Sequence, residues 1–182
     1  MADFDTFAGT LLEESKRFLE KAAENKNDDA AHAAYLHASL NLAFASAEAH
    51  INAVAEELAS HTEFSAPHDK GVLLEKEVRL DNGEFKLKGD RFYPLEERVM
   101  FIHRRVTSQP LDKKTQWWSD LGSAIKLRNK LTHPKDEAPV IRAKDVAAAL
   151  TAVIECIDAI YRAVYKKPFP AAKRMLQSKL TF

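Results

Sequence analysis

The chain has 182 residues, of which 46% are hydrophobic and 30% charged, which suits one globular domain over residues 1–182 and excludes an intrinsically disordered chain. Only 5 glycines and 7 prolines occur, a balance that favours helices over a turn-rich sheet. The lone Cys156 excludes an internal disulfide framework. Because residues 1–10 do not read as a signal peptide and no apolar stretch approaches the ~20 residues that span a membrane, we expect a cytoplasmic protein.

Apolar residues recur at helical spacing along most of the chain. The strongest periodicity steps by four and three residues along a predicted helix over 29–60 and places six apolar side chains on one face: Leu40, Phe44, Ala47, Ile51, Val54 and Leu58. The other predicted helices cover about 5–23, 94–107, a segment ending near residue 132, and 144–166. The tail over 168–182 is expected to end in a short basic helix. We therefore predict an all-α, up-and-down bundle of about five helices with a four-helix core.

One segment breaks the helical pattern. Between residues 62 and 93 the periodicity fails, and residues 78–87 alternate in the manner of two short strands. Asn82 and Gly83 between them suit a tight turn with positive φ angles. We predict a β-hairpin insertion, over about 74–90, packed on the helical body, because two strands alone are only marginally stable.

The net charge of zero conceals a gradient along the chain. Residues 1–65 carry 4 basic and 12 acidic side chains, whereas residues 66–182 carry 23 basic and 15 acidic side chains. Six basic residues lie between 113 and 135 with only Asp120 opposing them: Lys113, Lys114, Lys126, Arg128, Lys130 and Lys135. Such a patch attracts a phosphate backbone. A solvated helix face balanced by the acidic half is the alternative.

Arg128 and His133 form the strongest chemical candidate. Pro134 disfavours the helical conformation for His133, so the imidazole can fold back toward the helix face that presents Arg128. Arginine has a planar fork that matches phosphate oxygens, and histidine exchanges protons near neutral pH. Together they suit attack of an RNA 2′-hydroxyl on its neighbouring phosphate, without a metal ion. Basic residues also favour helix C-termini for structural reasons, and that reading stays open.

Weaker candidates surround this pair. A polar line on the 29–60 helix places Glu48 where it can orient Arg128 or His133, or forms a solvated stripe: His37, Asn41, Glu48 and Asn52. Of Trp117 and Trp118, one is expected in the core and the other could stack a base, although core or dimer packing of both is the simpler alternative. No histidine spacing indicates a zinc site, and Cys156 is expected to be an inert core filler.

Residues 127–134, Leu-Arg-Asn-Lys-Leu-Thr-His-Pro, resemble the signature of the HEPN family, in which arginine, often followed by asparagine, precedes a histidine by four to six residues. Residues 28–166 also resemble the family in arrangement, since the motif closes a late helix that one amphipathic helix follows, and residues 46–52 resemble its early long helix. The hairpin departs from that pattern. The resemblance implies a homodimeric, metal-independent endoribonuclease without cofactors, in which Arg128 and His133 are catalytic and Asn129 supports them.

The resemblance further implies a role in toxin–antitoxin or phage-defence systems, with an antitoxin or a nucleotidyltransferase as partner protein. We expect Lys126, Lys130 and Lys135 to contact the RNA backbone. Some family members only bind, so the alternative is a non-catalytic module that binds a nucleotide, RNA or protein. A purely structural bundle is the third possibility.

Overall fold

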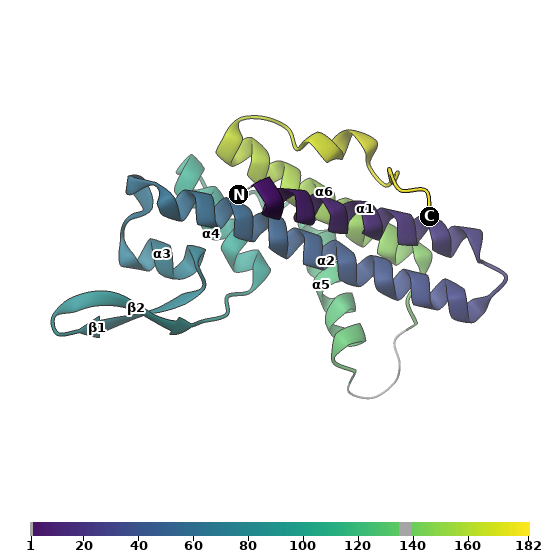
Figure 1. Ribbon diagram of the computed structural model, residues 1–182, viewed down its shortest axis with the longest axis horizontal. Coiled ribbons are helices and arrows are strands. Elements are labelled where there is room, and N and C mark those ends of the chain that lie inside the picture. Colours follow the sequence, from purple (N-terminus) through teal and green to yellow (C-terminus); the bar gives the residue numbers. More distant parts are fainter. Residues whose placement is uncertain (1, 135–139) are drawn as a thin grey trace.

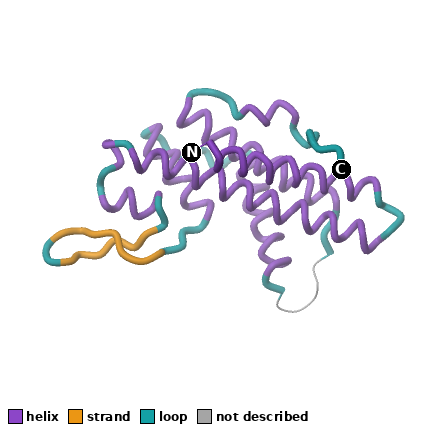
Figure 2. Tube along the Cα trace, in the orientation of Figure 1, coloured by secondary structure: helices purple, strands orange, loops and turns teal. Residues whose placement is uncertain are grey.

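The computed structural model describes residues 2–134 and 140–182, and most of these are helical (Figures 1 and 2). The elements follow in this order: α1 (Ala2–Glu24), α2 (Asp29–Ser60), the 3-10 helix η1 (Thr62–Phe64), α3 (Pro67–Leu73), β1 (Lys76–Asp81), β2 (Glu84–Asp90), α4 (Leu95–Thr107), α5 (Gln116–Thr132), α6 (Ala143–Tyr165) and the 3-10 helix η2 (Pro170–Arg174). Within the described residues, six α-helices therefore replace the predicted five. None of them is long and apolar enough to cross a membrane.

Helix α2 is the long axis of the molecule and lies beside α1 (Figure 1). Asp28 caps its first turn, since the side chain accepts a hydrogen bond from the Ala31 amide at 3.0 Å. The six apolar residues of the predicted stripe are all buried: Leu40, Phe44, Ala47, Ile51, Val54 and Leu58. The predicted bounds of this helix and its inner face are confirmed.

Helix α6 lies at the centre of the bundle, because it contacts α1, α2, α4 and α5. Its buried face follows the predicted spacing from Val146 to Ile160. Cys156 lies on this face, and burial raises the pKa of its thiol to about 12. A thiol that stays protonated and enclosed packs as a small apolar residue, as predicted.

The β-hairpin projects from one end of the bundle (Figures 1 and 2). Asn82 and Gly83 adopt φ values of 52° and 85° at its turn, and Leu80 pairs with Phe85 across the two strands. The hairpin packs on α3 through Gly71, where an added Cβ would lie 2.5 Å from Val78 Cγ2. The sequence did not predict the two short helices of the segment 62–93, because η1 and the seven-residue α3 are too short to show a period.

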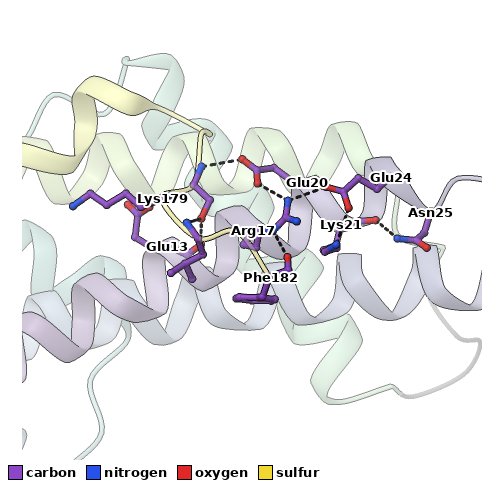
Figure 3. A network of polar contacts seen from close by, with 10 residues as sticks. Glu13, Arg17, Glu20, Lys21, Glu24, Asn25, Lys179 and Phe182 are labelled. Carbon is purple, nitrogen blue, oxygen red and sulfur yellow. Dashed lines mark hydrogen bonds and ion pairs between the residues drawn. The ribbon is translucent and has the colours of Figure 1, made fainter.

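The tail after α6 folds back along α1 (Figure 3). The tail does not end in the predicted basic helix: the 3-10 helix η2, with Lys173 and Arg174 in its last turn, lies near the start of the tail, and residues 175–182 are not helical. Glu13 of α1 receives hydrogen bonds from the Arg174 guanidinium at 2.5 Å and from the Lys179 amide at 2.6 Å. Burial alone would raise the pKa of Glu13, but these bonds and the charges of Lys16 and Arg174 lower it.

Candidate functional site

Helix α5 ends where Pro134 predicts that it should end. Helix α5 ends at Thr132, and His133 adopts φ −133° and ψ 63°, outside the helical region. The His133 amide donates to the Asn129 carbonyl at 2.9 Å, so the backbone of the last turn is satisfied locally. Its side chain is exposed. The predicted helix stop is confirmed, and it leaves an imidazole at an open helix end.

Arg128 joins α5 to α2. Its Nη2 donates to Glu48 Oε1 at 2.6 Å, and its Nη1 donates to Asn129 Oδ1 at 3.2 Å. The guanidinium carbon also lies 5.5 Å from the centre of the buried Phe44 ring. Arg128 therefore has a fixed orientation, set by a carboxylate on one side and an aromatic face on the other.

This ion pair lies near the surface. The Arg128 and Glu48 side chains are 29% and 45% exposed, so the pair contributes roughly 0–1 kcal/mol to folding. Although the pair adds little stability, it still orients the Arg128 guanidinium, because Nη1 and Nη2 each have a hydrogen-bond acceptor. Of the two roles that the sequence allowed for Glu48, the contact with Arg128 is the one present.

Arg128 and His133 both lie at the C-terminal end of α5, but they are not bonded to each other. Among the hydrogen bonds and ion pairs of the described residues, none joins the guanidinium to the imidazole. Both side chains are accessible, Arg128 in part and His133 freely, so neither is buried under the tail. That they engage the same phosphodiester stays a prediction.

The structure describes two of the three lysines that were predicted to bind phosphate. Lys126 and Lys130 are exposed on α5, and neither has a carboxylate partner among the residues that the structure describes. Lys135 lies outside the described residues. The two exposed lysines add positive charge to the helix end that presents Arg128, which favours an anionic ligand there.

The polar line on α2 leads to a second arginine that sequence reasoning missed. Arg98 of α4 is 4% exposed, and its Nη1 donates to Asn52 Oδ1 at 2.6 Å and to Glu75 Oε2 at 3.1 Å. Burial lowers the pKa of Arg98, which the charges of Glu75 and Glu48 oppose. Glu48 thus lies between two arginines, and the Glu48–Asn52 part of the line is not merely a solvated stripe. The sequence interpretation gave Asn52 no partner of its own, and its place in the polar line is the signal that could have indicated one.

The two tryptophans that the sequence offered as candidates are packed against other side chains. Trp117 and Trp118 are both half-buried and pack edge to face, with ring centres 5.6 Å apart. That favours the packing alternative over a free base-stacking ring. In the described parts of the chain, no group of three or more His, Cys, Asp or Glu side chains is placed to hold a metal ion.

No protein-family model, curated protein or solved structure matches this chain. The resemblance to the HEPN family therefore stays a prediction that rests on the motif over 127–134 and on the helical arrangement.

Proposed function

We propose that the chain is a metal-independent endoribonuclease of the HEPN type, with its site at the C-terminal end of α5. The observation that carries this proposal is the fixed Arg128, held by Glu48 at 2.6 Å, five residues before an exposed His133 that lies beyond the last helical turn. A fixed guanidinium beside an accessible imidazole supplies both charge stabilisation and proton transfer for a phosphodiester.

The reaction we propose is transfer of the phosphate within RNA. The His133 imidazole removes the proton of the 2′-hydroxyl as its oxygen bonds to phosphorus, and the bond from phosphorus to the 5′ oxygen breaks. Arg128 balances the negative charge that develops on the phosphate oxygens. The departing 5′ oxygen takes a proton, so the products are a 2′,3′-cyclic phosphate and a 5′-hydroxyl end.

A homodimer would supply the second proton. In a symmetric pair, His133 of the partner subunit can protonate the 5′ oxygen while the first imidazole acts as base. We place this activity in the cytoplasm, as the toxin of a toxin–antitoxin or phage-defence system, with an antitoxin or nucleotidyltransferase as partner. The exposed Lys126 and Lys130 would contact the RNA backbone.

The test compares two histidines that follow helix ends. His133→Ala should abolish cleavage of single-stranded RNA in excess chelator, while its circular dichroism stays that of the parent protein. His61→Ala is the matched control, because His61 is exposed, follows α2 and caps it through its backbone amide. An oligonucleotide of 2′-deoxy residues should stay intact. Continued cutting by the His133 variant would refute the mechanism.

The second candidate is a module that binds RNA, a nucleotide or a protein without cleaving it. One observation favours it: Glu48 already neutralises the Arg128 charge, so a phosphate must compete with a carboxylate. Under this alternative, RNA binding survives in chelator, no cyclic phosphate forms, and Glu48→Gln tightens binding.

A further inference from the structure

Phe92 is the most exposed large aromatic residue among the described side chains. It is 80% exposed and lies in the segment 91–94, which connects β2 to α4. The backbone on both sides of it is fixed: the Arg91 amide donates to the Glu75 carbonyl at 2.8 Å, and the Tyr93 amide donates to Glu75 Oε1 at 3.2 Å. A phenyl ring on an anchored backbone is presented to solvent at a defined place.

That place adjoins the proposed catalytic site. Phe92 lines a small cavity of about 50 Å³ together with Glu48, Asn52 and Arg98. Glu48 is the residue that holds the Arg128 guanidinium. Glu48 thus links the two residues, because it lines the same cavity as Phe92 and pairs with Arg128 of α5.

The surroundings of Phe92 suit a nucleobase better than a protein partner. A stable protein interface needs roughly 800 Å² from each partner, with an apolar centre. Phe92 instead has Arg91 before it in the chain, and the cavity that it lines is small and mixed, with Glu48, Asn52, Glu75 and Arg98 beside Tyr93 and Leu95. A nucleobase needs only one flat aromatic face, and a nearby cation suits the phosphate that it carries. Because the cavity is too small for a base, the base would lie over its mouth.

We infer that Phe92 stacks a nucleobase of single-stranded RNA next to the phosphate that Arg128 binds. This inference rests on the proposed function and adds to it a residue that contacts the base of the unpaired RNA. A paired base keeps its faces stacked on its neighbours within the duplex, so it cannot use the Phe92 ring.

The experiment measures binding apart from cleavage. The probe is a short, fluorescein-labelled, single-stranded oligonucleotide of 2′-O-methyl nucleotides, which lacks the attacking hydroxyl and stays intact on the wild-type protein. Phe92→Ala should raise Kd by about 5- to 150-fold, the range of one lost base stack, and Phe92→Trp should keep the wild-type Kd. Leu80→Ala is the matched control, since Leu80 is 67% exposed on the hairpin but does not line the cavity.

A second arm identifies the stacked base. Placing one abasic residue at each position of the probe in turn should reveal a position where wild type and Phe92→Ala bind equally. A duplex of the same sequence should bind both proteins equally. Equal weakening by Leu80→Ala, or a Phe92→Ala effect on self-association without one on RNA binding, would overturn the inference and indicate a protein contact instead.

The two proposals fail separately. If unmodified RNA is cut equally by wild type and Phe92→Ala, and the probe binds both equally, the Phe92 inference is wrong and the nuclease proposal stands. If the probe shows the Phe92 dependence but wild type cuts no RNA in chelator, the stacking site stands and the nuclease proposal is wrong.

Discussion

Glu13 and Lys16 form a buried ion pair whose disruption should destabilise the protein strongly. Lys16 is 0% exposed and Glu13 is 8% exposed, and the ammonium donates to Glu13 Oε1 at 3.4 Å. Among the side chains that the structure describes, those of residues 6–134 and 140–182, no other acceptor for the Lys16 ammonium is found. Glu13→Ala therefore leaves a positive charge inside the protein without a partner, a situation that costs far more than a lost surface contact.

The size of the expected loss depends on which of the donors to Glu13 can find another acceptor in the variant. The Arg174 side chain is 33% exposed and can turn to water, and the Lys179 amide belongs to the half-buried tail. The Lys16 ammonium has no such route, because its side chain is fully enclosed. We expect Glu13→Ala to lower the free energy of unfolding by about 3 to 5 kcal/mol. Replacing the charge as well, in Glu13→Ala/Lys16→Met, should restore about 2 kcal/mol or more of this loss.

Urea unfolding followed by helical circular dichroism measures these differences. Glu20→Ala is the matched control: Glu20 pairs with Arg17 at 3.0 Å and accepts from the Ser178 amide, but its side chain is 34% exposed. It should lose less than about 1 kcal/mol. If Glu13→Ala falls within the range of Glu20→Ala, or if adding Lys16→Met restores nothing, the enclosed charge is not the source of the loss and the reasoning fails.

The same pair predicts a pH dependence. The pKa of Glu13 is lowered from its ordinary value of 4.5 on folding, so the unfolded chain takes up the proton first as the pH falls. The stabilisation by the carboxylate is therefore complete above about pH 4.5 and is lost as the pH falls through the lower, folded pKa. The stability gap between wild type and Glu13→Ala should narrow over that acidic range and stay constant at neutral pH.

Two further substitutions test the site and the hairpin. Glu48→Gln should change the free energy of unfolding by less than about 1 kcal/mol, because the pair with Arg128 is partly exposed. The same variant should lower the initial rate of RNA cleavage. A faster rate would show that Glu48 restrains Arg128 rather than orienting it. Gly71→Ala should lower the free energy of unfolding by about 1 to 3 kcal/mol, since its Cβ would meet Val78 at 2.5 Å, and this outweighs a gain of up to ~1 kcal/mol in helix propensity. Gly89→Ala, whose Cβ meets nothing within 4 Å, is its control in urea unfolding, and equal behaviour of the two variants would rule out the close packing.

The parts of the fold that depend on local order were predictable from the sequence. The buried stripe from Leu40 to Leu58 repeats over several turns, and Asn82-Gly83 encodes its own turn, so neither needs information from distant residues. Helix α3 escaped prediction because seven residues give fewer than two periods. The contacts of the tail with Glu13 escaped because they join residues more than 160 positions apart.

In the candidate site, too, the features set by neighbouring residues were predictable and those set by tertiary packing were not. Pro134 acts on its immediate neighbour, so the end of α5 and the release of His133 follow from the sequence. The contact of Glu48 with Arg128 was one of two predicted options, and only the packing of α2 beside α5 decides between them. Arg98 and Phe92 were missed because their positions depend on where the hairpin returns to the bundle, which no local pattern records.

Helix α2 is about 48 Å long, and it contacts each of the other α-helices. The hairpin, by contrast, packs mainly on the short α3. Amide hydrogens at the centre of α2 can therefore exchange with solvent only when the bundle opens as a whole, and those of β2 can exchange through local fraying. Deuterium uptake should separate the two time scales within one sample. Slow uptake at β2 that appears only when RNA is added would mark the hairpin as a segment that rigidifies around its ligand.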